Sequence, residues 1–140
     1  MKKSPLIKIT LLFMIGTMLA ACSGSVSSEL AGDWKLISYG SITNPTPAVP
    51  NAESSLTFES DGTLSGSVGC NSFSGDYKVE GNTITFRAIA ATEMACAEPL
   101  MQQESAVFSI FSGSTTFKVE GNTLTITSAD GKSVALFVKK

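Results

Sequence analysis

The 140-residue sequence contains no histidine, one arginine and no cluster of lysine and arginine residues. Without histidine, the chain cannot assemble a Ser-His-Asp or Cys-His catalytic arrangement, and it lacks the commonest protein ligand of metal ions. A nucleic-acid-binding surface neutralises phosphates with several neighbouring cations. We therefore expect no metal, no other cofactor and no nucleic-acid partner.

Catalysis without histidine would need paired carboxylates or a serine–lysine arrangement. The acidic residues show no motif spacing (Asp33, Glu59, Asp61, Asp76 and Glu93), and the few lysines occupy ordinary strand positions. The sequence therefore predicts that this protein is not an enzyme.

The chain has one long apolar run, Ile9 to Leu19, and this run is shorter than the roughly 20 residues that span a membrane. Three lysines (Lys2, Lys3 and Lys8) make the region around its start positive. This pattern is typical of a signal peptide covering residues 1–21, and a single transmembrane anchor is the alternative. Removing residues 1–21 leaves seven basic and twelve acidic residues, a net charge of −5.

The motif Leu19-Ala20-Ala21-Cys22 matches the lipobox of bacterial lipoproteins, with Cys22 as the lipidation site. There the cysteine thiol carries a diacylglycerol by thioether linkage, and the freed amine accepts a further acyl chain such as palmitate. Two or three chains hold a protein firmly in a membrane. An ordinary cysteine after a chance match is the alternative.

Residues 22–31 then form the lipidated cysteine and a small, polar, flexible tether. We expect an extracytoplasmic, membrane-anchored lipoprotein in either kind of bacterial envelope. In a Gram-negative host the outer membrane facing the periplasm is favoured, because Ser23 stands where inner-membrane lipoproteins commonly carry Asp.

Short alternating segments separated by glycine turns predict a β-rich domain over residues 32–140. The expected strands are Asp33–Ser38, Leu56–Glu59, Thr63–Val68 and Ser133–Val138, with turns at Asp61-Gly62 and Asp130-Gly131. Three prolines (Pro45, Pro47 and Pro50) predict a stiff, extended loop rather than a strand between the first two.

An internal repeat predicts two further hairpins. Residues 77–86 recur at 117–126, and the peptide Lys-Val-Glu-Gly-Asn-Thr is identical in both copies. Each turn would use Gly and Asn at positive φ. A matched pair of hairpins in one sheet is the structural interpretation, and an exposed Glu-Gly-Asn binding turn is the alternative.

One helix is expected between the two repeat copies. Glu98-Pro99 suits a helix start, and Gly113 suits a C-terminal cap. Its apolar face, expected to pack on the sheet, contains Leu100, Met101, Val107, Phe108 and Phe111. The predicted architecture is α+β: a small antiparallel sheet or partly closed barrel with one principal helix.

Cys70 and Cys96 form an even pair in an oxidising compartment, so a disulfide between them is the simple inference. It would close a loop of about 27 residues, worth roughly 3.5 kcal/mol in the chain-entropy model. A metal site and a redox pair are the competing interpretations.

The residues around these cysteines resemble a known signature. GCNSFSGDY at residues 69–77 and ATEMAC at residues 91–96 are similar to the paired motifs of META domains, including the heat-shock-inducible HslJ-like lipoproteins. The early Trp-x-Leu strand of that family has a counterpart at Trp34-Lys35-Leu36. Glu93 departs from related sequences, which often carry Arg or Lys there.

The resemblance implies a role in the cell envelope under stress, because HslJ-like proteins are associated with heat shock and novobiocin resistance. It implies no catalytic residues. The preferred interpretation of the signature is structural, with Gly69 and Gly75 in tight turns, Asn71 bonded to a bend, and Phe73, Tyr77 and Met94 in the core. A ligand site at Asn71, Ser72, Asp76 and Thr92 is the alternative.

Together these features predict a non-enzymatic envelope lipoprotein that binds a protein, peptide or lipid. The alternatives are a secretion-pilot or protease-inhibitor-like module that captures a peptide, and a small-ligand or lipid binder. The loop from Asn44 to Pro50 is the expected contact element for peptide capture.

Overall fold

The computed structural model describes residues 28–140, so the predicted signal peptide, most of the tether and Cys22 lie outside the described residues. The elements follow in the order β1 (Gly32–Ser41), β2 (Thr46–Pro47), β3 (Ser55–Phe58), β4 (Thr63–Ser67), β5 (Ser72–Glu80), β6 (Thr83–Ala91), α1 (Glu98–Ile110), β7 (Ser114–Glu120), β8 (Thr123–Thr127) and β9 (Ser133–Lys139).

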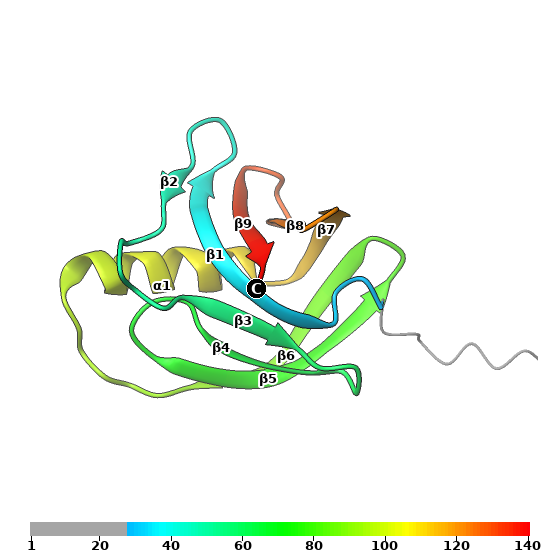
Figure 1. Cartoon of the computed structure of the whole chain (residues 1–140), viewed down its shortest axis with the longest axis horizontal. Helices are drawn as coiled ribbons and strands as arrows, with labels where there is room; N and C mark the ends of the chain where they lie inside the picture. The colour runs from blue at the N-terminus through cyan, green and yellow to red at the C-terminus, as the bar shows by residue number, and fades with distance from the viewer. Residues whose placement is uncertain (1–27) are drawn as a thin grey trace, which may run out of the picture.

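Eight of these strands form an antiparallel barrel (Figure 1). The strands follow one another in the order β1, β3, β4, β5, β6, β7, β8 and β9, and β1 closes the barrel by pairing with β9. The pairing of β1 with β9 contains a bulge between Leu36 and Ser38. The predicted antiparallel sheet or partly closed barrel with one helix is therefore confirmed.

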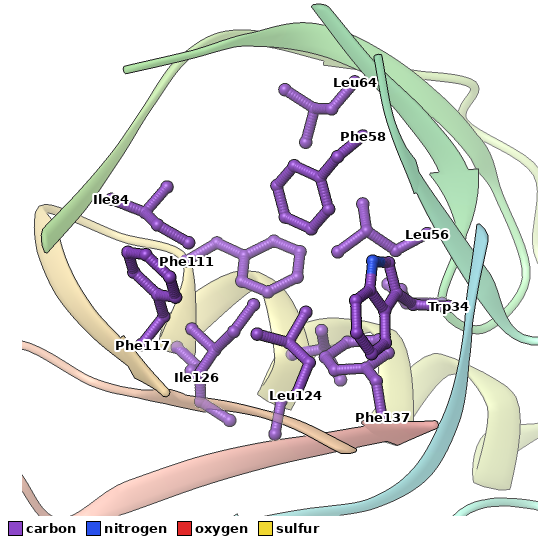
Figure 2. Packing of buried hydrophobic residues seen from close by; sticks show 14 of the residues in the cluster. Trp34, Leu56, Phe58, Leu64, Ile84, Phe111, Phe117, Leu124, Ile126 and Phe137 are labelled. Atoms are coloured by element: carbon purple, nitrogen blue, oxygen red, sulfur yellow. The ribbon is translucent and has the colours of Figure 1, made fainter. Parts of the chain in front are cut away.

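Side chains from all around the barrel fill its interior. The alternation of each strand directs every second residue inward, and Trp34, Phe58 and Phe137 are almost fully buried there. Figure 2 shows these aromatic rings packed with leucine and isoleucine side chains. An eight-stranded barrel has just enough internal width for such a packed core.

The two repeat copies form the hairpins β5–β6 and β7–β8, as predicted. Glu80 pairs with Thr83, and Glu120 pairs with Thr123, so each turn has two central residues. Gly81 and Gly121 take positive φ values of 62° and 59°. The asparagines that follow them do not, which corrects that part of the prediction; a two-residue hairpin turn can require positive φ at its first position alone.

Helix α1 begins where Pro99 predicted and inserts its apolar side into one end of the barrel. Val107, Ile110 and Phe111 are buried. Phe111 points into the interior (Figure 2), and its ring stacks on that of Phe86 with centroids 4.4 Å apart. Within the described residues, no helix is long and apolar enough to cross a membrane.

The proline-containing segment differs from its prediction at one point. Pro47 lies in the two-residue strand β2 and pairs with Ser38 of β1. Proline is tolerated there because β2 is an edge strand.

The seam between β6 and β7 is short. These strands pair only through Thr83–Thr85 of β6, whereas β6 pairs with β5 up to Ala91. The residues from Arg87 to Ala91 are exposed. The second half of β6 therefore has one edge without a neighbouring strand among the described residues.

Candidate functional site

The signature cysteines form a disulfide, as predicted. The Cα atoms of Cys70 and Cys96 are 5.8 Å apart, and the bond joins the bend after β4 to the segment between β6 and α1. Two parts of the chain that are 26 residues apart are thus held together at the helix end of the barrel.

Asn71 is the centre of a buried hydrogen-bond network beside this disulfide. Its Oδ1 accepts hydrogen bonds from the Thr92 hydroxyl at 2.8 Å and the Met94 backbone N–H at 2.7 Å. Its Nδ2 donates to the Met94 carbonyl at 3.3 Å and to Glu104 Oε1 at 2.7 Å. All four hydrogen-bonding positions of the amide are occupied, so Asn71 fixes the bend, as predicted.

Glu104 is the acceptor on the other side of the network, and none of the sequence motifs indicated it. This helical carboxylate is 7% exposed. It accepts hydrogen bonds from the backbone N–H of Cys70 at 2.8 Å, from the backbone N–H of Asn71 and from the Asn71 amide. A signal was available, since Gln103 and Glu104 lie three and four residues after Leu100 and therefore belong to the buried helical face.

The alternative ligand set does not come together. Thr92 contacts Asn71, but Ser72 and Asp76 are exposed on β5, where they pair with Ser67 and Thr63 of β4. The signature residues therefore form a structural network rather than a shared ligand site.

Two signature residues, Met94 and Gly75, have different roles from those predicted. Met94 is 56% exposed and is not a core contact. Gly69 lies in the bend between β4 and β5, as predicted, whereas Gly75 lies inside strand β5, and neither has a positive φ. A Cβ on Gly69 would lie 2.6 Å from the Cβ of Glu104, and one on Gly75 would lie 2.8 Å from the carbonyl oxygen of Arg87. Both glycines are needed for close packing. Phe73 and Tyr77 are buried, as predicted.

A hollow on the outer wall is the second candidate site. We call it the β1 groove: it lies between Lys35–Ile37 of β1, the segment Ala48–Ser54 and Lys140, and its volume is about 530 Å³. In Figure 1 the segment between β2 and β3 swings away from β1 and passes in front of α1. The groove lies where β1, among the described residues, has no strand partner on this side between Lys35 and Ser38.

Gln103 of helix α1 holds the outer rim of the β1 groove through hydrogen bonds. The side chain is fully buried on α1. Its Oε1 accepts a hydrogen bond from the Val49 N–H at 2.7 Å, and its Nε2 donates to Ser54 Oγ and to the Val68 carbonyl, each at 2.8 Å. Gln103 thus fixes both ends of the segment from Val49 to Ser54.

Solved structures with a similar fold are known. An NMR structure of a protein from Burkholderia xenovorans is 24% identical, with a TM-score of 0.64, and the match covers 79% of this chain and 83% of that one. A DUF4847 family protein from Bacteroides vulgatus, solved by crystallography, is 15% identical, with a TM-score of 0.57 and coverage of 81% and 95%. These likenesses show the fold alone.

No curated protein sequence matches the chain. The META domain family model matches residues 28–140, which is the whole of the described barrel with its helix, disulfide and Asn71 network. The chain therefore belongs to the META domain family.

Proposed function

We propose that this chain is a lipid-anchored, extracytoplasmic META-domain protein that works by binding at its outer surface in the envelope stress response. The observation that supports this proposal best is the filled barrel. Trp34, Phe58 and Phe137 occupy the interior, where a ligand-carrying barrel would hold its ligand. A ligand or partner would therefore bind outside, and the β1 groove is a hollow surface suited to it.

The buried polar side chains support a binding role over catalysis. Asn71, Gln103 and Glu104 use their polar atoms in hydrogen bonds to backbone and neighbouring side chains. They are therefore committed to holding the fold.

The acidic groups at the turns are likewise used for local structure. The Thr63 hydroxyl donates a hydrogen bond to Asp61 and keeps the pKa of that carboxyl below its usual range. The Ser128 hydroxyl lowers the pKa of Asp130 in the same way. Neither carboxylate is prepared to take up a proton near neutral pH, as a general acid would.

The anchor is tested by replacing Cys22 with serine in the full chain. We expect the variant to lose acyl labelling and to leave the membrane fraction, because a serine hydroxyl cannot form the thioether. The folded domain should keep the same melting temperature, since Cys22 takes no part in the Cys70–Cys96 bond. Subcellular fractionation and metabolic labelling with palmitate measure this, and a Cys22→Ser protein that stays processed and membrane-bound would contradict the proposal.

Capture of an extended peptide is the second candidate function, and the open edge of β6 favours it. The Thr92 N–H donates to the Ser72 carbonyl, and Ala90 pairs with Ser74. In an antiparallel pair, hydrogen-bonded and non-hydrogen-bonded residues alternate along the strand, so the backbone N–H and C=O of Ala91, between them, point away from β5. An added strand would bond to these groups.

Ala91→Pro removes the outward N–H and should abolish cross-linking to such a peptide, whereas Ala91→Val keeps the N–H and should preserve it. Equal cross-linking by the two variants, at equal melting temperatures, would exclude capture at this edge.

A further inference from the structure

We propose that the β1 groove is a preformed site for a small amphiphilic carboxylate, a molecule with one anionic head and an apolar body. This inference deepens the proposed binding function and rests on it. The groove combines several apolar side chains, two lysines that form no ion pair among the described residues, and a rim that is held by hydrogen bonds within the protein.

Apolar side chains line part of the groove and are accessible. Ile37 is 39% exposed, so part of its apolar surface is open to a ligand. It lies at the bulge where the β1–β9 register shifts, and bulges commonly redirect a side chain. Ala48, Pro50 and Ala52 also line the groove. The volume of about 530 Å³ lies within the range of small-molecule sites, roughly 300–1,000 Å³.

The charge of the groove is opposite to that of the rest of the domain. The side chains of Lys35, Lys140 and Glu53 line it, and together these three side chains carry a charge of +1. The remaining five basic and eleven acidic residues of 28–140 give −6. The ion pairs of the described chain are Lys78–Glu80 and Lys118–Glu120, so neither groove lysine has a carboxylate partner there. An anionic head group would supply that partner.

The rim is fixed by buried bonds that do not depend on a ligand. Gln103 bonds to Val49 and Ser54. The Ala48 N–H donates to the Ile37 carbonyl, and the Leu36 N–H donates to the Ser54 carbonyl. Asn51, at the outermost part of the rim, has a φ of 61°, a conformation uncommon for residues other than glycine. Such preorganisation lowers the entropic cost of binding.

The binding test uses residues 28–140, because they contain the whole barrel and its core. Octanoate is the probe, compared with acetate, octanol and octyltrimethylammonium in NMR titrations at low salt. We expect saturable shifts from octanoate at Lys35, Ile37 and the Ala48–Ser54 rim. Acetate lacks the apolar body, octanol lacks the charge and the ammonium has the wrong charge, so each should bind at least tenfold more weakly. Raising the salt concentration should weaken octanoate binding through screening.

Matched variants locate the site. Lys35→Ala with Lys140→Ala should weaken octanoate binding roughly tenfold, because partly screened ion pairs each contribute on the order of a few-fold. Lys118→Ala, on β7, is the control and should leave the affinity unchanged. Ile37→Ser should weaken octanoate binding as well, and all variants should show the unfolding midpoint of the parent within error.

Equal binding of octanol, equal binding of the ammonium, or shifts outside the groove would overturn the proposal. Cosedimentation with phosphatidylglycerol vesicles that depends on Lys35 would also overturn it, since the groove would then recognise a membrane surface. These results do not depend on the lipid anchor. If octanoate does not bind but Cys22→Ser behaves as expected, the carboxylate-site proposal is rejected and the lipoprotein proposal remains.

Discussion

Replacing Glu104 with alanine is expected to lower the free energy of unfolding by about 3–5 kcal/mol, in the lower part of the range for three orphaned buried donors. The carboxylate accepts three hydrogen bonds in a buried position, from two backbone N–H groups and the Asn71 amide. Its removal leaves these donors without an acceptor where water does not reach, and each orphaned buried group costs roughly 1–3 kcal/mol. Chemical denaturation of residues 28–140, followed by the fluorescence of Trp34, measures the loss.

Two variants on the same helix separate this effect from helix propensity. Glu98→Ala changes an exposed acid whose side chain accepts one bond from Gln102, so the stability should be nearly unchanged. Glu104→Gln keeps the shape of the side chain but turns an amide N–H₂ toward the donors. The free energy of unfolding of this variant should therefore lie between those of the parent and of Glu104→Ala. A Glu104→Ala protein as stable as Glu98→Ala would show that the network contributes little.

Loss of the disulfide is expected to have the second largest effect. Changing both Cys70 and Cys96 to serine should destabilise the domain by about 3.5 kcal/mol, because the unfolded chain regains the freedom of a loop of about 27 residues. A small domain has only about 5–15 kcal/mol of net stability. The measurement is the unfolding midpoint of parent and variant, with and without reductant.

The variant should be insensitive to reductant, and the reduced parent should match it. The disulfide and Glu104 both hold the bend at Cys70, so a combined variant should lose an amount different from the sum of the separate losses. Additive losses would show that the disulfide and the hydrogen-bond network act independently. A parent protein whose unfolding midpoint does not change with reductant would contradict the disulfide itself.

Local patterns predicted most of the fold. Three of these patterns depend only on residues close together in the sequence. They are the alternation at Trp34 and Leu36, the repeated Glu-Gly-Asn-Thr turns and the Glu98-Pro99 helix start. Barrel closure was left open, because the pairing of β1 with β9 depends on residues about a hundred positions apart.

The candidate sites were harder to predict, since they depend on contacts between distant segments. The Cys70–Cys96 disulfide and the role of Asn71 were predicted from local motifs. The positions of Gln103 and Glu104 on the buried helical face could be read from the helical spacing, but their hydrogen-bond partners lie on distant segments and could not. Gly75 was misassigned because its small size serves the close approach of β6.

The pairing of the first barrel strand with the last also limits when the molecule can fold. A polypeptide is synthesised from its N-terminus, so β1 emerges long before β9. Until β9 arrives, β1 has an unpaired edge, and Trp34 and Leu36 lack their partners Lys139 and Phe137. Contacts of such high sequence separation make folding slow. The nascent chain therefore stays open to chaperones and proteases until its final strand is available, and a truncation that removes β9 should never reach the folded state.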